Sequence, residues 1–205
     1  MTFLTDNDKQ RIREAVEIAE NQTSGEFVTV IARQADQYLY IPTLCAAILS
    51  LLTPFFLAIY NSALQFQSVY SIQLGVFVTL TILFRWPAIT MILIPRAVKL
   101  QRAKRLAWEQ FFELGLHHTR QRNGVMLFVC VAEKYVEIIA DKGINDKVEQ
   151  AQWDTIIKDF TSAVKRGNIA DGFIVSIESC GNLLKSHFPK GENDVNELSN
   201  QLVEI

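Results

Sequence analysis

Two carboxylates and one amide stand where the sequence predicts the ends of β-strands. Glu26 begins the β-branched, apolar segment Glu26–Ala32, Asn123 precedes a glycine at a predicted turn, and Asp141 ends the predicted strand Tyr135–Asp141. Sites in α/β proteins commonly open at strand ends, and Ca²⁺ and Mg²⁺ prefer oxygen ligands. If Glu26, Asn123 and Asp141 lie at one sheet edge, they form a candidate divalent-cation site, with Glu26 and Asp141 as candidate catalytic residues.

These residue types also have a simpler interpretation, which the sequence favours. Asp is common at turns and helix caps without any function, so Asp141 can serve as a turn or cap residue. Glu26 can equally be a solvated side chain at the start of its strand. The distinction depends on whether the three side chains converge in space.

Other kinds of catalytic or binding site find little support. The chain contains no GxSxG, P-loop, GxGxxG or HExxH motif. His117 and His118 are adjacent, a spacing that cannot place both rings on one metal from a single helix face. No CxxC spacing is present, so we expect structural thiols. A net charge of −2 argues against nucleic acid as a partner.

The charge distribution is the most distinctive feature of the chain. No Asp, Glu, Lys or Arg lies between Asp36 and Arg85, and this stretch contains two apolar blocks, Ile41–Tyr60 and Val69–Phe84. Twenty apolar residues form a helix about 30 Å long, the thickness of a bilayer core. Two core helices of a soluble protein are the alternative, but the rest of the chain is too short to cover both. We therefore predict a transmembrane helical hairpin over residues 37–95, joined by a polar loop.

The end of the second membrane helix has two possible positions. It can stop at Arg85, or it can pass Arg85 and end near Pro95. The second choice places an arginine inside the bilayer at a cost of about 2.5 kcal/mol or more. We therefore favour an interfacial Arg85, with Ala88–Ile94 lying along the membrane or packing on the soluble domain.

Basic residues cluster on one side of the predicted hairpin, whereas the loop between its helices carries no charge. By the positive-inside rule this places both chain ends in the cytoplasm. The basic side chains can also contact anionic lipid headgroups. The candidate membrane-interface residues are Arg85, Trp86, Arg96, Lys99, Arg102, Lys104 and Arg105.

The remaining residues predict a small mixed sheet of three or four strands with helices packed on it, an α/β domain. Helices are expected from the N-cap Thr5, over Arg96–Leu114, over Asp146–Arg166 and from Ile169 to Phe188; strands are expected over Glu26–Ala32, Val125–Ala132 and Tyr135–Asp141. The predicted organisation is a first domain part (1–36), the hairpin (37–95), a second domain part (96–189) and a polar, loosely ordered tail (190–205) with an apolar end.

Several of these segments together resemble the TPM domain family, named for thylakoid-lumen, photosystem-repair and nematode receptor-modulator proteins. They are Thr23-Ser24-Gly25-Glu26 leading into EFVTVIA, Thr119–Val125 leading into VMLFVCVAEKYVEIIADKGI, Trp153, Gly167, Asp171-Gly172, and the Leu183-Leu184 to Pro189 close. The hairpin, Arg85-Trp86-Pro87, Pro95–Lys99 and the tail from Asn196 resemble a bacterial membrane-bound subgroup.

This resemblance implies a TPM-type α/β sandwich anchored in the bacterial inner membrane, near a LemA-type membrane protein as partner. The family is often labelled a phosphatase, and plant lumenal members are described as binding calcium. Lumenal and periplasmic members often have Asp directly before the Asn-Gly turn. This chain has Arg122 there, which weakens an acidic metal site.

The sequence thus supports three functional hypotheses. The first is a membrane-anchored accessory or interaction protein without a defined catalytic constellation. The second is a metal-assisted phosphatase that uses Ca²⁺ or Mg²⁺ with Glu26, Asn123 and Asp141. The third is a lipid-binding regulator acting through Arg96–Arg105.

Overall fold

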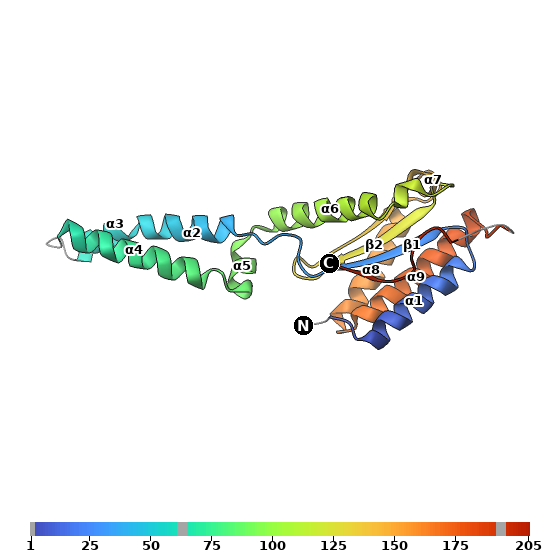
Figure 1. Ribbon diagram of the computed structural model, residues 1–205, viewed down its shortest axis with the longest axis horizontal. Coiled ribbons are helices and arrows are strands. Elements are labelled where there is room, and N and C mark those ends of the chain that lie inside the picture. The colour runs from blue at the N-terminus through green and yellow to red at the C-terminus, as the bar shows by residue number, and fades with distance from the viewer. Residues whose placement is uncertain (1–2, 61–64, 192–195) are drawn as a thin grey trace. The chain divides into compact units, whose positions relative to one another are not determined.

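Two segments far apart in the sequence build one α/β unit. The computed structural model describes residues 3–60, 65–191 and 196–205. Unit 1 contains Met1–Ala35 and Ala103–Ile205, and unit 2 contains Asp36–Arg102. The elements of both units are labelled in Figure 1.

The sheet of unit 1 has four strands in the order β3-β2-β1-β4. β1 (Glu26–Ala32) pairs in parallel with β2 (Gly124–Cys130), in a register that places Glu26 beside Gly124 and Ala32 beside Cys130. β3 (Tyr135–Ala140) is antiparallel to β2, and the short β4 (Val203–Glu204) is parallel to β1. A small mixed sheet with helices packed on it confirms the predicted fold class.

Both faces of the two central strands are covered, which explains their uninterrupted apolar sequences. Phe27, Ile31, Val125 and Leu127 pack on one side in a core with α1 (Asp6–Glu20), α8 (Gln150–Lys165) and α9 (Ile169–His187). Figure 1 shows these three helices beside one another. The opposite face packs against Ala103, Ala107 and Phe111 of α6 (Arg96–Glu113).

Local signals in the sequence set several helix ends. The Thr5 hydroxyl accepts a 3.2 Å hydrogen bond from the Asp8 backbone N–H, and the Thr5 N–H donates to Asp8 Oδ2 at 3.0 Å, a reciprocal capping box. The Thr5 hydroxyl also donates a 2.7 Å hydrogen bond to Asp8 Oδ2, and this bond, together with that from the Thr5 N–H, lowers the pKa of Asp8. Gly167 follows α8 with φ +89°, the left-handed conformation that glycine adopts most easily.

The helix predicted from Asp146 is divided in the structure. Asp141 caps a separate short helix, α7 (Lys142–Asn145), and α8 begins only at Gln150. The buried side chain of Val148 lies between them, and Glu149 forms a second capping box with Gln152. A short 3₁₀ helix, η1 (Leu116–His118), precedes β2.

Unit 2 contains the apolar helices. The first apolar block forms α2 (Tyr40–Leu51) and α3 (Thr53–Tyr60), and their division coincides with Pro54, which lacks the N–H needed to continue the helix. α4 (Phe66–Leu83) packs against both α2 and α3. The predicted loop Asn61–Ser68 falls partly on residues 61–64, which lie outside the described residues.

Two helical spans, Tyr40–Ile59 and Phe66–Leu83, are long and apolar enough to cross a membrane. α4 ends before Arg85, and Pro87 begins a separate helix, α5 (Pro87–Leu93). The Thr90 hydroxyl lies at this break and donates a 2.7 Å hydrogen bond to the carbonyl oxygen of Phe84. The basic segment α6 then begins at Arg96.

Candidate functional site

The three predicted site residues lie along one edge of the sheet. Glu26 pairs with Gly124 and donates its backbone N–H to the carbonyl oxygen of Asn123 at 3.1 Å. Asp141 donates its backbone N–H to the carbonyl oxygen of Gly124 at 2.9 Å. Gly124 therefore stands between Glu26 on β1 and Asp141 after β3, and the residues form a row across three strands.

The Glu26 side chain is engaged by the C-terminal segment. Its Oε1 accepts a 3.2 Å hydrogen bond from the backbone N–H of Glu197, and its Oε2 accepts a 3.3 Å bond from that of Leu198. Glu26 is only 4% exposed, so the interpretation of a solvated Glu26 is wrong. The described part of the predicted loose tail is thus bonded to the sheet.

A second buried carboxylate, Glu20, lies beside Glu26 but is not among the predicted site residues. Glu20 Oε1 accepts a 3.0 Å hydrogen bond from the Phe27 N–H, and Oε2 accepts one of 3.3 Å from Asn196 Nδ2. Burial, with a smaller contribution from the charge of Glu26, raises the pKa of Glu20 to about 7. The sequence feature that could have revealed Glu20 is its position four residues after Val16, which places it on the apolar face of α1.

Asn123 and Asp141 each hold one buried oxygen without a partner among the described residues. Asn123 donates its side-chain amide to the carbonyl oxygen of Ser24, which leaves Asn123 Oδ1 unpaired. Asp141 Oδ1 accepts a 2.6 Å bond from the Lys142 N–H, as expected of the predicted cap residue, which leaves Asp141 Oδ2 unpaired. Buried polar atoms are normally hydrogen-bonded, so these two oxygens mark a place where a ligand group could bind.

The residues at this edge supply few ligands for a divalent cation. The carboxylate of Glu26 is occupied by two backbone amides, and Asp141 shares its pocket with the cations Arg122 and Lys142. Among the residues that the structure describes, no group of three His, Cys, Asp or Glu side chains could hold a metal ion. Ca²⁺ needs six to eight oxygen ligands, so the predicted trio does not supply a sufficient site.

Asp141 instead borders a pocket with a volume of about 450 Å³. One wall is aromatic: the ring centroids of Trp108 and Phe112 are 6.0 Å apart, and those of Phe112 and His117 are 5.1 Å apart. His117 Nδ1 is buried and has no hydrogen-bond partner in the described part of the chain. The lining residues are Trp108, Phe111, Phe112, His117, Arg122, Ala140, Asp141, Lys142 and Asn145.

Comparison with known protein families finds a match in the second part of the chain. Residues 88–183 match the family model named TPM_phosphatase and described as the TPM domain. The chain contains a TPM domain. The match includes β2, β3 and α6–α8 of the α/β unit, whereas α1 and β1 precede it in the sequence.

A solved structure has the same fold as this chain. It is the NMR structure of the BA42 protein from the psychrophilic bacterium Bizionia argentinensis, with 23% sequence identity and a TM-score of 0.63. The alignment covers 100% of this chain and 97% of the other. No curated protein matches the sequence significantly.

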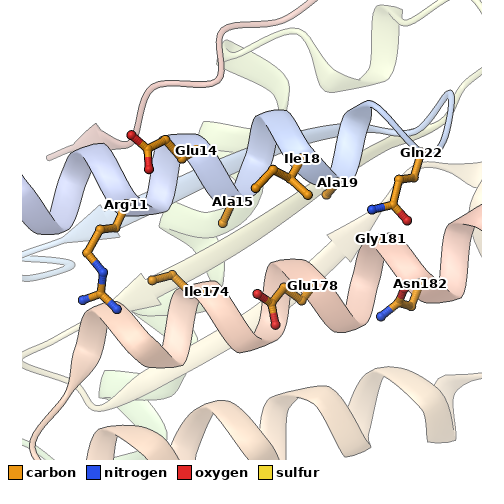
Figure 2. A pocket seen from close by; sticks show the side chains of 10 residues that line it. All are labelled: Arg11, Glu14, Ala15, Ile18, Ala19, Gln22, Ile174, Glu178, Gly181 and Asn182. Atoms are coloured by element: carbon orange, nitrogen blue, oxygen red, sulfur yellow. The ribbon is translucent and has the colours of Figure 1, made fainter.

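A second pocket lies between α1 and α9. Figure 2 shows Arg11 and Glu14 of α1 and Gln22, just after α1, along its length, and Glu178 and Asn182 of α9 opposite them. Its floor is a helix-packing seam, because a Cβ added to Gly181 would meet the Ala19 Cβ at 3.0 Å. Arg11 forms a 2.7 Å ion pair with Asp171 at one end. These contacts indicate helix packing.

The predicted membrane-interface residues divide into two groups. Lys99, Arg102 and Arg105 have intramolecular partners: the Met91 carbonyl oxygen at 2.6 Å, Asp36 Oδ2 at 3.4 Å and Glu109 Oε1 at 2.7 Å, respectively. Arg85, Trp86, Arg96 and Lys104 are exposed. The side chains in this second group are available to an external surface.

The cysteines outside the apolar helices are unreactive. Burial raises the pKa of Cys130, whose thiol donates a 2.8 Å hydrogen bond to Glu133 Oε2. Burial also raises the pKa of Cys180 to about 12. Both thiols therefore stay protonated near neutral pH, as expected for structural cysteines.

Proposed function

We propose that this chain is a membrane-anchored accessory protein of the bacterial inner membrane, whose TPM domain interacts with a membrane-protein partner. The observation that carries the proposal is the exposure of the apolar helices. In the most apolar 18 residues of Tyr40–Ile59, only 17% are buried. In the span Phe66–Leu83, none are buried.

This exposure argues against the alternative of two core helices in a soluble protein. Core helices that are apolar on every side are buried on every side. Phe55, Phe56 and Ile59 are instead 63–71% exposed, and Phe66 is 86% exposed. Leaving apolar surface in water costs about 25 cal/mol per Å², whereas bilayer hydrocarbon removes this cost.

The charge pattern supports an orientation with both chain ends in the cytoplasm. Arg85, Arg96 and Lys104 follow the second span and are exposed, as residues at a phospholipid surface would be. Anionic headgroups attract such side chains by about 1 kcal/mol each near the surface. The resemblance to the membrane-bound TPM subgroup suggests a LemA-type protein as the partner.

A specific observation favours metal-assisted phosphatase activity as a second candidate. Asn123 Oδ1 and Asp141 Oδ2 are buried acceptors without partners among the described residues, on both sides of Gly124. The matching family model also carries the word phosphatase in its name. The positive charges of Arg122 and Lys142 beside Asp141 disfavour a metal ion there, so this candidate is second.

Membrane extraction tests the anchor. The wild-type chain should stay in membranes washed with alkaline carbonate. The double variant Leu74→Glu/Val78→Glu should be released, because each charge near a helix centre costs about 2.5 kcal/mol or more. Ile18→Glu/Val175→Glu, which charges two exposed apolar residues of unit 1, is the matched control and should remain bound. Release of the wild-type chain would refute the anchor.

Reporter fusions test the orientation, and affinity capture tests the partner. A fluorescent reporter that folds only in the cytoplasm should be active after Ile205, and activity solely of a periplasmic reporter would refute the orientation. Capture from solubilised membranes should enrich one membrane protein with the wild-type chain.

Hydrolysis of phosphomonoesters that depends on Ca²⁺ or Mg²⁺ and is lost in Asp141→Asn would instead establish the second candidate.

A further inference from the structure

We propose that the pocket beside Asp141 binds a small anionic ligand with a planar ring, of the purine mononucleotide class, in place of a metal ion. The proposal is independent of the membrane anchor and concerns a ligand of unit 1. It rests on three features of the pocket: two adjacent cations, an aromatic wall, and two buried polar atoms without partners.

The two cations are brought together by a close backbone contact. Gly143 follows Lys142, and a Cβ added to Gly143 would lie 2.6 Å from the carbonyl oxygen of Arg122 and 2.9 Å from that of Gln121. The turn before β2 therefore rests directly on α7. Arg122 and Lys142, on the two sides of this contact, both line the pocket.

Both cations are available to a ligand. Their side chains are exposed, and neither forms an ion pair with another described residue. Among the described residues that line the pocket, Asp141 is the one carboxylate. The formal charge of the pocket is therefore positive. A guanidinium and an ammonium group are the usual partners of a phosphate, because arginine can donate two parallel N–H bonds to its oxygens.

The aromatic wall suits a planar ring. Trp108 and Phe112 are 39% and 53% exposed although they belong to a helix whose other face is buried, and their rings are tilted by 36° to each other. Exposed aromatic rings of this kind stack readily on nucleobases. The volume of about 450 Å³ lies within the range of small-molecule sites, about 300–1,000 Å³.

The unpaired polar atoms specify the remaining ligand chemistry. Asp141 Oδ2 is a buried acceptor and requires an N–H or O–H donor, such as the exocyclic amine of a purine. His117 Nδ1 lies in the same pocket and can pair with a ring nitrogen or a hydroxyl. A molecule with a phosphate, a flat ring and a ring-borne donor therefore satisfies all three features, whereas a divalent cation satisfies only Asp141.

Calorimetric and fluorescence titrations of the full-length protein in detergent test this proposal. The probes are adenosine 5′-monophosphate, adenosine, inorganic phosphate and calcium chloride. The monophosphate should bind saturably and quench tryptophan fluorescence, because Trp108 lines the pocket. It should bind at least about tenfold more tightly than adenosine or phosphate, and its affinity should fall as salt is added.

Paired variants identify the site. Arg122→Asn/Lys142→Ala should weaken binding of the monophosphate at least about tenfold. The matched control Lys134→Asn/Lys165→Ala removes two exposed lysines elsewhere, one of them also at positive φ, and should stay within about twofold of wild type. Circular dichroism verifies that all variants are folded, and Trp108→Leu should abolish the quenching.

Four outcomes would overturn the proposal. The first is the absence of saturable binding by the monophosphate. The second is equal affinity of the monophosphate for the cation double variant and its control. The third is binding of inorganic phosphate as tightly as the monophosphate. The fourth is Ca²⁺ binding that Asp141→Asn abolishes, since this would restore a metal site.

Discussion

Glu26 Oε2 accepts a 3.3 Å hydrogen bond from the backbone N–H of Leu198, a residue 172 positions further along the chain. Glu26 Oε1 accepts a second bond from the adjacent amide of Glu197. These bonds precede β4, which pairs with Val30 and Ile31 of β1. A buried carboxylate at the first position of the central strand therefore positions the segment that completes the sheet.

Replacing Glu26 should release this segment. Glu26→Ala removes both acceptors, and hydrogen bonds to a charged group contribute about 1.5–3 kcal/mol each, so we expect a loss of at least about 2 kcal/mol in the free energy of unfolding. Hydrogen–deuterium exchange of residues 196–205 should accelerate before global unfolding. Glu178→Ala, at an exposed position of α9, is the control and should leave exchange unchanged.

The titration of Glu20 predicts a pH dependence of stability. Its folded-state pKa of about 7 lies above the ordinary value of 4.5, so the folded state binds the proton more tightly. The contribution is fully present below about pH 4.5 and is lost as pH rises through 7. It amounts to about 3 kcal/mol. Glu20→Gln, which retains a carbonyl acceptor for Phe27, should therefore be more stable than wild type at pH 8 and similar at pH 4.5.

Chemical denaturation across this pH range measures the effect. Glu14→Gln neutralises an exposed carboxylate of the same helix and should show the wild-type pH profile. If Glu20→Gln and Glu14→Gln have the same profile, Glu20 is not the titrating group.

The contact beneath the pocket makes Gly143 intolerant of a side chain. Gly143→Ala would place a Cβ 2.6 Å from the Arg122 carbonyl oxygen, so either the turn or α7 must move. We expect a destabilisation of about 1–3 kcal/mol, as for other overpacked sites. Thermal denaturation measures the loss. Gly191→Ala, where the added Cβ meets nothing within 4 Å, should be neutral, and equal melting temperatures would contradict the contact.

Arg122 itself adopts φ +51°, which is unfavourable for a residue with a long side chain. Asn tolerates this conformation better, so Arg122→Asn should stabilise the protein by roughly 0.5–1 kcal/mol. Arg120→Asn, two residues earlier and without positive φ, should give no such gain in urea denaturation. A loss of stability in Arg122→Asn would mean that the arginine side chain contributes more than its backbone costs.

The fold was predictable where neighbouring residues determine the structure. The run of β-branched residues from Glu26 to Ala32 predicted β1 with its observed bounds, and Thr5 with Asp8 predicted the start of α1. Gly167 marked the end of α8 for the same reason, since its conformation depends on its own lack of a side chain. The division between α7 and α8 was missed because Val148 fits the apolar pattern of one continuous helix in the sequence, although it is buried between the two helices in the structure.

The candidate site was predictable only in part. The sequence placed Glu26, Asn123 and Asp141 near strand ends, but whether they meet at one edge, and where their side chains point, depends on partners distant in sequence. The Glu26 carboxylate accepts hydrogen bonds from backbone amides near the C-terminus. Arg122 and Lys142 come to the same pocket because the backbone at Gly143 approaches the Arg122 carbonyl closely. Residue types at strand ends cannot reveal such contacts.

The ion pair between Arg102 Nε and Asp36 Oδ2 has a consequence for how the chain folds. β1 and β2 are separated by the whole of unit 2, and joining such distant segments normally has a large loop-closure entropy. Because Asp36 and Arg102 are the first and last residues of unit 2, a helical hairpin formed early brings the two ends of this long connection together. The parallel pairing of β1 with β2 then becomes a short-range event, and the hairpin should form before the sheet.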